Sequence, residues 1–198
     1  MIANRLSEYL VESKYTIERE DSIAQRFVNR SWLSPIAYLH TIYRPTAPLV
    51  VQKISGILRF PEEIDMVYKY MNGASLFSGA IQFFGCVEEG LLLDRANPLS
   101  LPPLSIVEMN NMFISKEHGD QFLCIGGYSY DRSLVCIDRN TGEAVCFRGD
   151  ALTAVRKSWV SVEKWLSDEI QRLGLLFSPD GKQLVDEKYE LPDVMTHQ

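Results

Sequence analysis

Four cysteines and three histidines are the side chains of this chain best suited to nucleophilic or metal chemistry. They are Cys86, Cys124, Cys136, Cys146, His40, His118 and His197. A structural zinc site needs four converging ligands, commonly with one closely spaced pair, and no Cys-x-x-Cys pair occurs here. The histidines are far apart in the sequence. We therefore expect no metal site and no bound cofactor.

The thiols are also poorly placed for catalysis. Cys124, Cys136 and Cys146 lie within apolar runs, which favours core packing. Cys136 and Cys146 are close enough in sequence to face each other across a hairpin, so a disulfide is the alternative to free thiols. His118 lies in KEHGD, which is typical of a solvated loop. No Gly-x-Ser-x-Gly motif, phosphate-binding loop or dinucleotide fingerprint occurs, so we predict no catalytic residue.

Paired carboxylates are the remaining route to catalysis, and Glu88-Glu89 is the most prominent pair. Neighbours on a strand point to opposite faces, so these two share a site only where the backbone bends. A carboxylate-dependent hydrolase is therefore the minor alternative to a binding function. The stretch GGYSYDRS places Tyr128 and Tyr130 beside Asp131, which resembles a recognition surface. The alternative there is a hairpin loop with one packed tyrosine.

The net charge of −6 is unevenly distributed. Residues 1–59 carry eight Lys/Arg and five Asp/Glu, residues 60–131 three and ten, and residues 132–198 nine and eleven. The middle third is therefore at −7, which excludes wrapping a phosphate backbone and favours a basic partner. A solvated acidic surface is the alternative. With no long apolar run and no secretory signal pattern, we expect a cytoplasmic protein that binds neither nucleic acid nor membrane.

The elements that position these residues begin with two helices. Pro48 opens the first, with Leu49, Ile54 and Leu58 expected on one buried face. The second covers 61–73, with Pro61 at its first position and Asn72-Gly73 ending it. Its core-facing residues are predicted to be Ile64, Val67, Tyr68 and Met71. The first 30 residues have the pattern of weakly amphipathic helices.

The second half is predicted to be mainly β. We expect strands at 80–87, 91–93, 122–127, 133–138 and 143–147, with a tight turn at 138–142 between the last two. A short helix is expected at 105–113 and a closing helix at 161–174, capped by Ser161 and ended by Gly174. The buried face of the closing helix is predicted to be Val162, Trp165, Leu166, Ile170 and Leu173. Consecutive strands favour an α+β fold with a mainly antiparallel sheet.

Taken in order, five stretches resemble the SUKH superfamily, which includes bacterial immunity proteins and a fungal cell-wall synthesis regulator. They are PEEIDMVYKYMNG (61–73), AIQFFGCVEE (80–89), SIVEMNN (105–111), GDQFLCIGGYSYDRSLVCIDRNTGEAV (119–145) and SVEKWLSDEI (161–170). The similarity covers about residues 45–174, within which Asn72-Gly73 looks like the family's helix stop. We accordingly divide the chain into an N-terminal helical extension (1–44), a SUKH-like domain (45–174) and a C-terminal extension (175–198).

The resemblance implies a non-enzymatic module that binds a protein. Many relatives are thought to neutralise a toxin, often a nuclease, whose basic groove an acidic surface would occupy. The expectation is thus an immunity-type protein with a basic toxin domain as its partner. The alternative is a regulatory scaffold of cell-wall or stress physiology, with several partners; the sequence sets no oligomeric state. The partner-binding residues are expected to be Glu88, Glu89, Asp94, Asp120, Tyr130 and Asp131.

Overall fold

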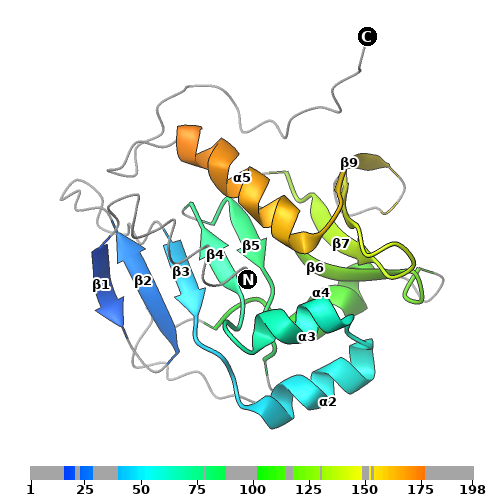
Figure 1. Ribbon diagram of the computed structural model, residues 1–198, viewed down its shortest axis with the longest axis horizontal. Helices are drawn as coiled ribbons and strands as arrows, with labels where there is room; N and C mark the ends of the chain where they lie inside the picture. The colour runs from blue at the N-terminus through cyan, green and yellow to red at the C-terminus, as the bar shows by residue number, and fades with distance from the viewer. Residues whose placement is uncertain are drawn as a thin grey trace.

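The computed structural model describes residues 16–20, 23–28, 40–77, 79–87, 102–114, 118–129, 131–148, 152 and 154–176. Within these residues, nine strands form one sheet whose spatial order is the chain order and whose neighbours are all antiparallel (Figure 1). The strands are β1 Thr16–Glu20, β2 Ala24–Val28, β3 His40–Tyr43, β4 Ala74–Leu76, β5 Ile81–Phe83, β6 Phe122–Tyr128, β7 Leu134–Asp138, β8 Ala144–Phe147 and β9 Val155–Trp159. The expected α+β class with a mainly antiparallel sheet is confirmed.

The N-terminal part departs from expectation, because β1, β2 and β3 are strands where we predicted helices. In β3 the buried His40 and Ile42 alternate with the half-buried Thr41 and Tyr43, which is the two-residue period of a strand. Pairing with β2 and β4 overrides the weak helical pattern of the sequence, since strand preference depends on cross-strand neighbours. The prediction of helices within residues 1–44 is therefore wrong for the part of this range that the structure describes. The three-part division of the chain stays a prediction.

The first helix, α2, spans Pro48–Leu58 and begins at Pro48 as predicted. Its buried face is only partly as expected, because Ile54 is buried whereas Leu49 is 77% exposed. Five residues correspond to about 140° around a helix, so Leu49 cannot share the face of Ile54. Leu58 packs against the core as predicted, and Val50 and Val51 do so in place of Leu49.

The second helix, α3, spans Glu62–Tyr68 and is shorter than predicted. Its predicted face is confirmed, since Ile64, Val67, Tyr68 and Met71 are all buried. Pro61 precedes the helix with an extended backbone instead of occupying its first helical position. The helix ends at Tyr68, so the Asn72-Gly73 pair lies beyond the helix end and does not cap it.

The Asn72-Gly73 pair instead attaches the chain to the sheet. The buried Asn72 side chain binds the backbone of Cys86, and Gly73 has a φ of +96°. A Cβ on Gly73 would lie 2.7 Å from the carbonyl oxygen of Phe83, closer than real contacts allow. The pair therefore sets how closely β4 approaches the strand that follows it, β5.

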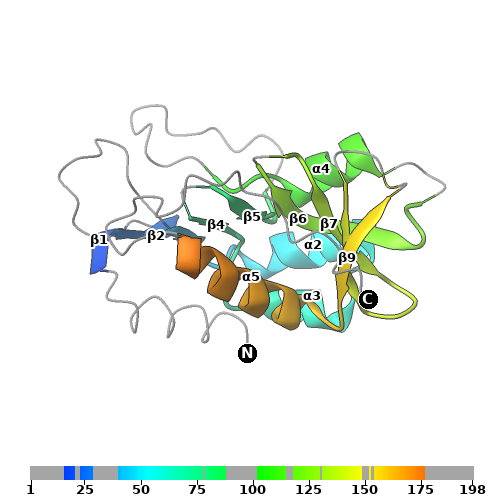
Figure 2. The same cartoon turned by 90° about the horizontal axis from the view of Figure 1, so that it is seen from above.

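The remaining helices are α4, Ile106–Phe113, and α5, Val162–Leu176. Figure 2 shows them on opposite sides of the central strands. The predicted face of α5 is confirmed, and Ser161 caps the helix by accepting the N–H of Lys164 at 3.1 Å. The helix continues two residues past Gly174, so its predicted end is early.

The predicted strands of the second half are confirmed as β6, β7 and β8, and the turn between β7 and β8 has Gly142 at a φ of +77°. β5, at Ile81–Phe83, covers only the first half of the 80–87 prediction, whereas 91–93 lies outside the described residues. β9 was not predicted. The residues of its sequence, VRKSW, are exposed or half-exposed except for Trp159. The strand therefore lacks the alternation of buried and exposed residues that is expected of a half-buried strand.

Candidate functional site

The predicted partner-binding residues lie only partly within the described chain. Glu88, Glu89, Asp94 and Tyr130 are outside it. Asp120 precedes β6 and Asp131 follows it, so the seven residues of Phe122–Tyr128 lie between them. A strand of this length measures about 23 Å, at roughly 3.3 Å a residue. The structure therefore places Asp120 and Asp131 near opposite ends of one strand and does not bring them together.

Both of these carboxylates already have partners. Asp120 Oδ1 lies 3.4 Å from Arg59 Nη1 in an exposed ion pair, which contributes little because water screens it. Asp131 Oδ2 accepts a hydrogen bond from Arg156 Nη1, and its Oδ1 accepts the N–H of Ser133 at 2.9 Å. The charge of Asp131 is thus largely balanced within the protein.

Tyr128 belongs to the core and not to a recognition surface. It is 2% exposed, and its hydroxyl accepts a hydrogen bond from Trp165 Nε1 at 2.9 Å. The alternative of a hairpin with one packed tyrosine is therefore correct for this residue. The neighbouring Tyr130 stays a prediction.

All four cysteines are buried and free. Cys136 pairs with Cys124 of β6 and with Val145 of β8, so it does not face Cys146 across the hairpin. Burial raises the pKa of the Cys86 and Cys146 thiols to about 12. These two thiols stay protonated near neutral pH and lack the thiolate that nucleophilic or metal chemistry requires.

The part of the chain that the structure describes contains neither a group of metal ligands nor a membrane-spanning helix. No three His, Cys, Asp or Glu side chains there are grouped so as to hold a metal ion. Among the same residues, no helix has the length and apolarity needed to cross a membrane.

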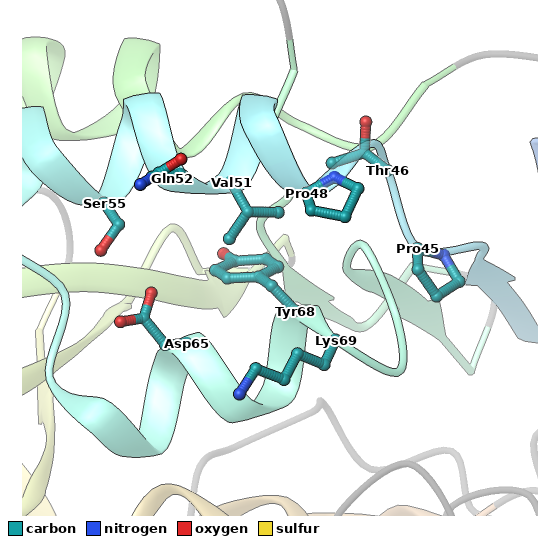
Figure 3. A pocket seen from close by; sticks show the side chains of 9 residues that line it. All are labelled: Pro45, Thr46, Pro48, Val51, Gln52, Ser55, Asp65, Tyr68 and Lys69. Carbon is teal, nitrogen blue, oxygen red and sulfur yellow. The ribbon is translucent and has the colours of Figure 1, made fainter.

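A hollow of about 520 Å³ lies between α2 and α3 (Figure 3). We call it the α2–α3 hollow. It is lined by Pro45, Thr46, Pro48, Val51, Gln52, Ser55, Asp65, Tyr68 and Lys69. Such a volume falls within the range of about 300–1,000 Å³ for ligand clefts.

The floor of the hollow is apolar and firmly held. Val51 points from α2 toward the ring of Tyr68 on α3 (Figure 3). The Tyr68 ring stacks on Phe60 at 5.3 Å between centroids, and its hydroxyl donates to the carbonyl oxygen of Phe84 at 2.8 Å. Burial raises the pKa of Tyr68, so the hydroxyl stays a hydrogen-bond donor. The floor therefore has a fixed shape and no free polar group.

Glu63 fixes the opposite side of α3. Burial raises the pKa of this carboxyl group, although its bonds to the backbone N–H groups of Glu163 and Val162 act in the other direction. These N–H groups belong to the first turn of α5, where a helix has unpaired donors. Glu63 thus ties α3 to α5, and this contact holds one wall of the hollow in place.

The rim of the hollow is polar and, in the described residues, has no internal partners. No hydrogen bond or ion pair engages the side chains of Gln52, Ser55 or Asp65. Asp65 and Ser55 extend toward each other from the two helices, while Lys69 lies one turn further along α3 (Figure 3). Among the residues that the structure describes, Lys69 Nζ has the sulfur of Met66 as its hydrogen-bond partner, at 3.3 Å. The rim therefore keeps its hydrogen-bonding capacity for another molecule.

Two smaller hollows differ in this respect. One, of about 190 Å³, is lined in part by Asn72, whose amide is bound to Cys86. The other, of about 270 Å³, contains Asp120 and Arg139, and Arg139 donates to the carbonyl oxygens of Leu58 and Arg59 at the end of α2. Their main polar groups are already engaged, so the α2–α3 hollow is the better candidate site.

The sequence analysis did not single out this hollow, although one signal was available. Asp65 and Lys69 stand four residues apart beside the apolar stripe of α3, where both side chains reach the edge of the buried face. Sequence spacing does not show that α2 packs across this edge. Searches with the chain found no matching family model, no matching curated protein and no matching solved structure.

Proposed function

We propose that this protein is a non-enzymatic protein-binding module, and specifically an immunity-type protein that neutralises a cognate toxin. The observation that carries the proposal is the α2–α3 hollow, whose apolar floor is fixed while its polar rim has no internal partners among the described residues. A preformed apolar patch with unengaged polar groups around it is the usual anatomy of a protein interface core and rim.

The charge distribution supports a basic partner. Residues 60–131 carry the −7 segment, and α3 opens it with Glu62, Glu63 and Asp65 in its first turn. An acidic surface attracts a basic toxin domain, such as a nuclease, and speeds its association. Glu88, Glu89 and Asp94 are proposed to add to this attraction, whereas Asp120, which is paired with Arg59, is proposed not to. The sequence resemblance to the SUKH superfamily, in which a helix after Pro61, the strands β5 to β8 and the tryptophan-containing α5 follow in order, supports the same function.

The test is a native pull-down of the tagged full-length protein from its source cells, followed by mass spectrometry. The baits are the unaltered chain, Asp65→Lys in the hollow, and Asp120→Lys as a matched charge reversal outside it. We expect one basic partner that Asp65→Lys loses and Asp120→Lys retains. When expressed alone, this partner should arrest growth, and co-expression of the protein should restore it.

Other outcomes would contradict the proposal at different points. Retention of the partner by Asp65→Lys would remove the hollow from the interface. Several unrelated partners would favour the regulatory scaffold. A single partner that does not arrest growth would refute the immunity function while leaving the binding function in place.

A further inference from the structure

We infer that the α2–α3 hollow receives an arginine side chain of the partner, together with an aliphatic side chain next to it. This inference rests on the proposed binding function and specifies the chemistry of the occupant. It follows from three properties of the hollow: its unpaired carboxylate, its additional acceptors and its apolar walls.

The unpaired carboxylate requires a cation. Asp65 is half-buried at the edge of an apolar floor, and in the described residues its side chain has no hydrogen bond or ion pair. A carboxylate at the edge of an apolar surface binds a positive group more strongly than one surrounded by water, because the local dielectric constant is lower. An occupant that brings a cation to Asp65 therefore gains a charge-assisted hydrogen bond that the free protein lacks.

The additional acceptors favour arginine over lysine. Ser55 and Gln52 line the hollow on α2, and Ser55 Oγ points toward Asp65 on α3 (Figure 3). Arginine has five N–H donors on a planar group and can reach several acceptors at once, whereas lysine has a compact and strongly hydrated ammonium group. The guanidinium is also the more weakly hydrated cation, so it enters a partly apolar hollow at lower cost.

The apolar walls explain the aliphatic neighbour. Val51, Pro45 and Pro48 provide apolar surface beside the acceptors. The methylene stem of an arginine lies along such a surface while its charged end reaches the carboxylate. A volume of about 520 Å³ leaves room for more than this stem, and a second apolar side chain fills it.

Lys69 makes a further, opposite contribution. It lines the same hollow and its ammonium group has no ion pair within the described residues, so it repels an approaching cation. Asp65 on α3 and Lys69 at the end of this helix lie four residues apart and must affect an arginine-bearing ligand in opposite directions. A general loss of structure would move both variants in the same direction, so this sign difference is diagnostic.

The experiment is selection of a random peptide library displayed on phage against the full-length protein. Asp65→Asn and Lys69→Gln are the hollow variants, and Asp120→Asn is the control. We expect the selected peptides to share an arginine beside an aliphatic residue. Asp65→Asn should weaken binding of a synthetic selected peptide about tenfold or more, as removal of a charge-assisted bond does. Lys69→Gln should strengthen binding about twofold to fivefold, and Asp120→Asn should leave it unchanged.

A second measurement separates arginine from positive charge in general. Changing the peptide arginine to lysine should also weaken binding about tenfold, because the planar fork is lost. Equal binding of the lysine peptide would overturn the inference. Acidic peptides that depend on Lys69 would overturn it too, as would a library that yields no peptide sensitive to Asp65→Asn. These results leave the proposed function standing if the pull-down partner is still lost by Asp65→Lys.

Discussion

The side-chain amide of Asn72 binds both backbone hydrogen-bonding groups of Cys86. Its Nδ2 donates to the Cys86 carbonyl oxygen at 3.1 Å, and its Oδ1 accepts the Cys86 N–H at 2.7 Å. Asn110 holds Cys124 in the same way, at 2.7 and 2.9 Å. In each case the amide takes the place of a strand neighbour, since β5 ends at Phe83 and pairs with β6 only beyond Cys124.

Replacing Asn72 with alanine should therefore destabilise the fold. Asn72→Ala leaves a buried N–H and a buried C=O of Cys86 without partners, at a cost of about 1–3 kcal/mol for each group. We expect the free energy of unfolding, measured by urea denaturation, to fall by about 2 kcal/mol or more. Asn111→Ala, on the exposed side of α4, is the control and should change it by less than about 0.5 kcal/mol. Equal losses in the two variants would contradict the role given to Asn72.

Alanine substitutions at two glycines should change the stability of the protein in opposite directions. Gly73→Ala places a Cβ 2.7 Å from a backbone oxygen at a φ of +96°, so it should destabilise the protein by more than about 1 kcal/mol. Gly56 lies within α2, and a Cβ there meets nothing within 4 Å. Gly56→Ala should stabilise the protein by about 0.5–1 kcal/mol, because alanine is the better helix former. Thermal unfolding of both variants measures whether each substitution raises or lowers stability. Destabilisation by Gly56→Ala would contradict the placement of Gly56 within α2 with open space around it.

Charge reversal at Asp131 should weaken the fold as well as any binding. Asp131→Lys removes the carboxylate bound to Arg156 and to the Ser133 N–H, and places two cations side by side. We expect a loss of about 1.5–3 kcal/mol in the free energy of unfolding, the range for hydrogen bonds to charged groups. Adding Arg156→Glu to Asp131→Lys should restore part of this loss in a double-mutant cycle. Strictly additive losses would show that the pair is not coupled.

His40 should make the protein sensitive to acid. Burial lowers its pKa from 6.5 to about 3, and its Nδ1 accepts the N–H of Phe77 at 3.3 Å. Between these pKa values the unfolded chain binds a proton that the folded protein does not. Stability is therefore lost as the pH falls below 6.5, by up to about 1.4 kcal/mol per pH unit.

The comparison variant for this prediction is His40→Asn, which keeps an acceptor near Phe77 but does not titrate. Urea denaturation between about pH 7 and pH 5 should show a steeper loss of stability for the unaltered protein than for the variant. The same slope in both proteins would mean that His40 is already accessible to protons in the folded state.

Much of the fold could be predicted from local patterns, because those patterns report burial directly. The apolar stripe of α5, the face of α3 and the three strands from Phe122 to Phe147 each combine strong periodicity with clear end signals. The N-terminal strands could not be predicted in this way, since cross-strand pairing and not a strong local pattern holds them. β9 could not be predicted either, because this edge strand contains Arg156 and Lys157 and shows little alternation of apolar and polar residues.

The candidate site was less predictable than the fold. Sequence reasoning selected acidic residues by charge, but charge alone does not show which carboxylates are already paired. Asp131 was chosen and has Arg156 as its partner, whereas Asp65 was not chosen and has no partner within the described residues. The difference arises from tertiary packing, which places β9 beside one carboxylate and the apolar face of α2 beside the other.

The sequential order of the sheet has a consequence for how the protein is made. Each strand pairs with the strands that precede and follow it in the chain, so the sheet can grow in the order in which a ribosome delivers it. Of the described elements α5 emerges last, and until then the sheet surface that receives the fully buried Trp165 faces water. A nascent chain halted before residue 162 therefore presents a broad apolar surface to chaperones, and synthesis of α5 ends that exposure.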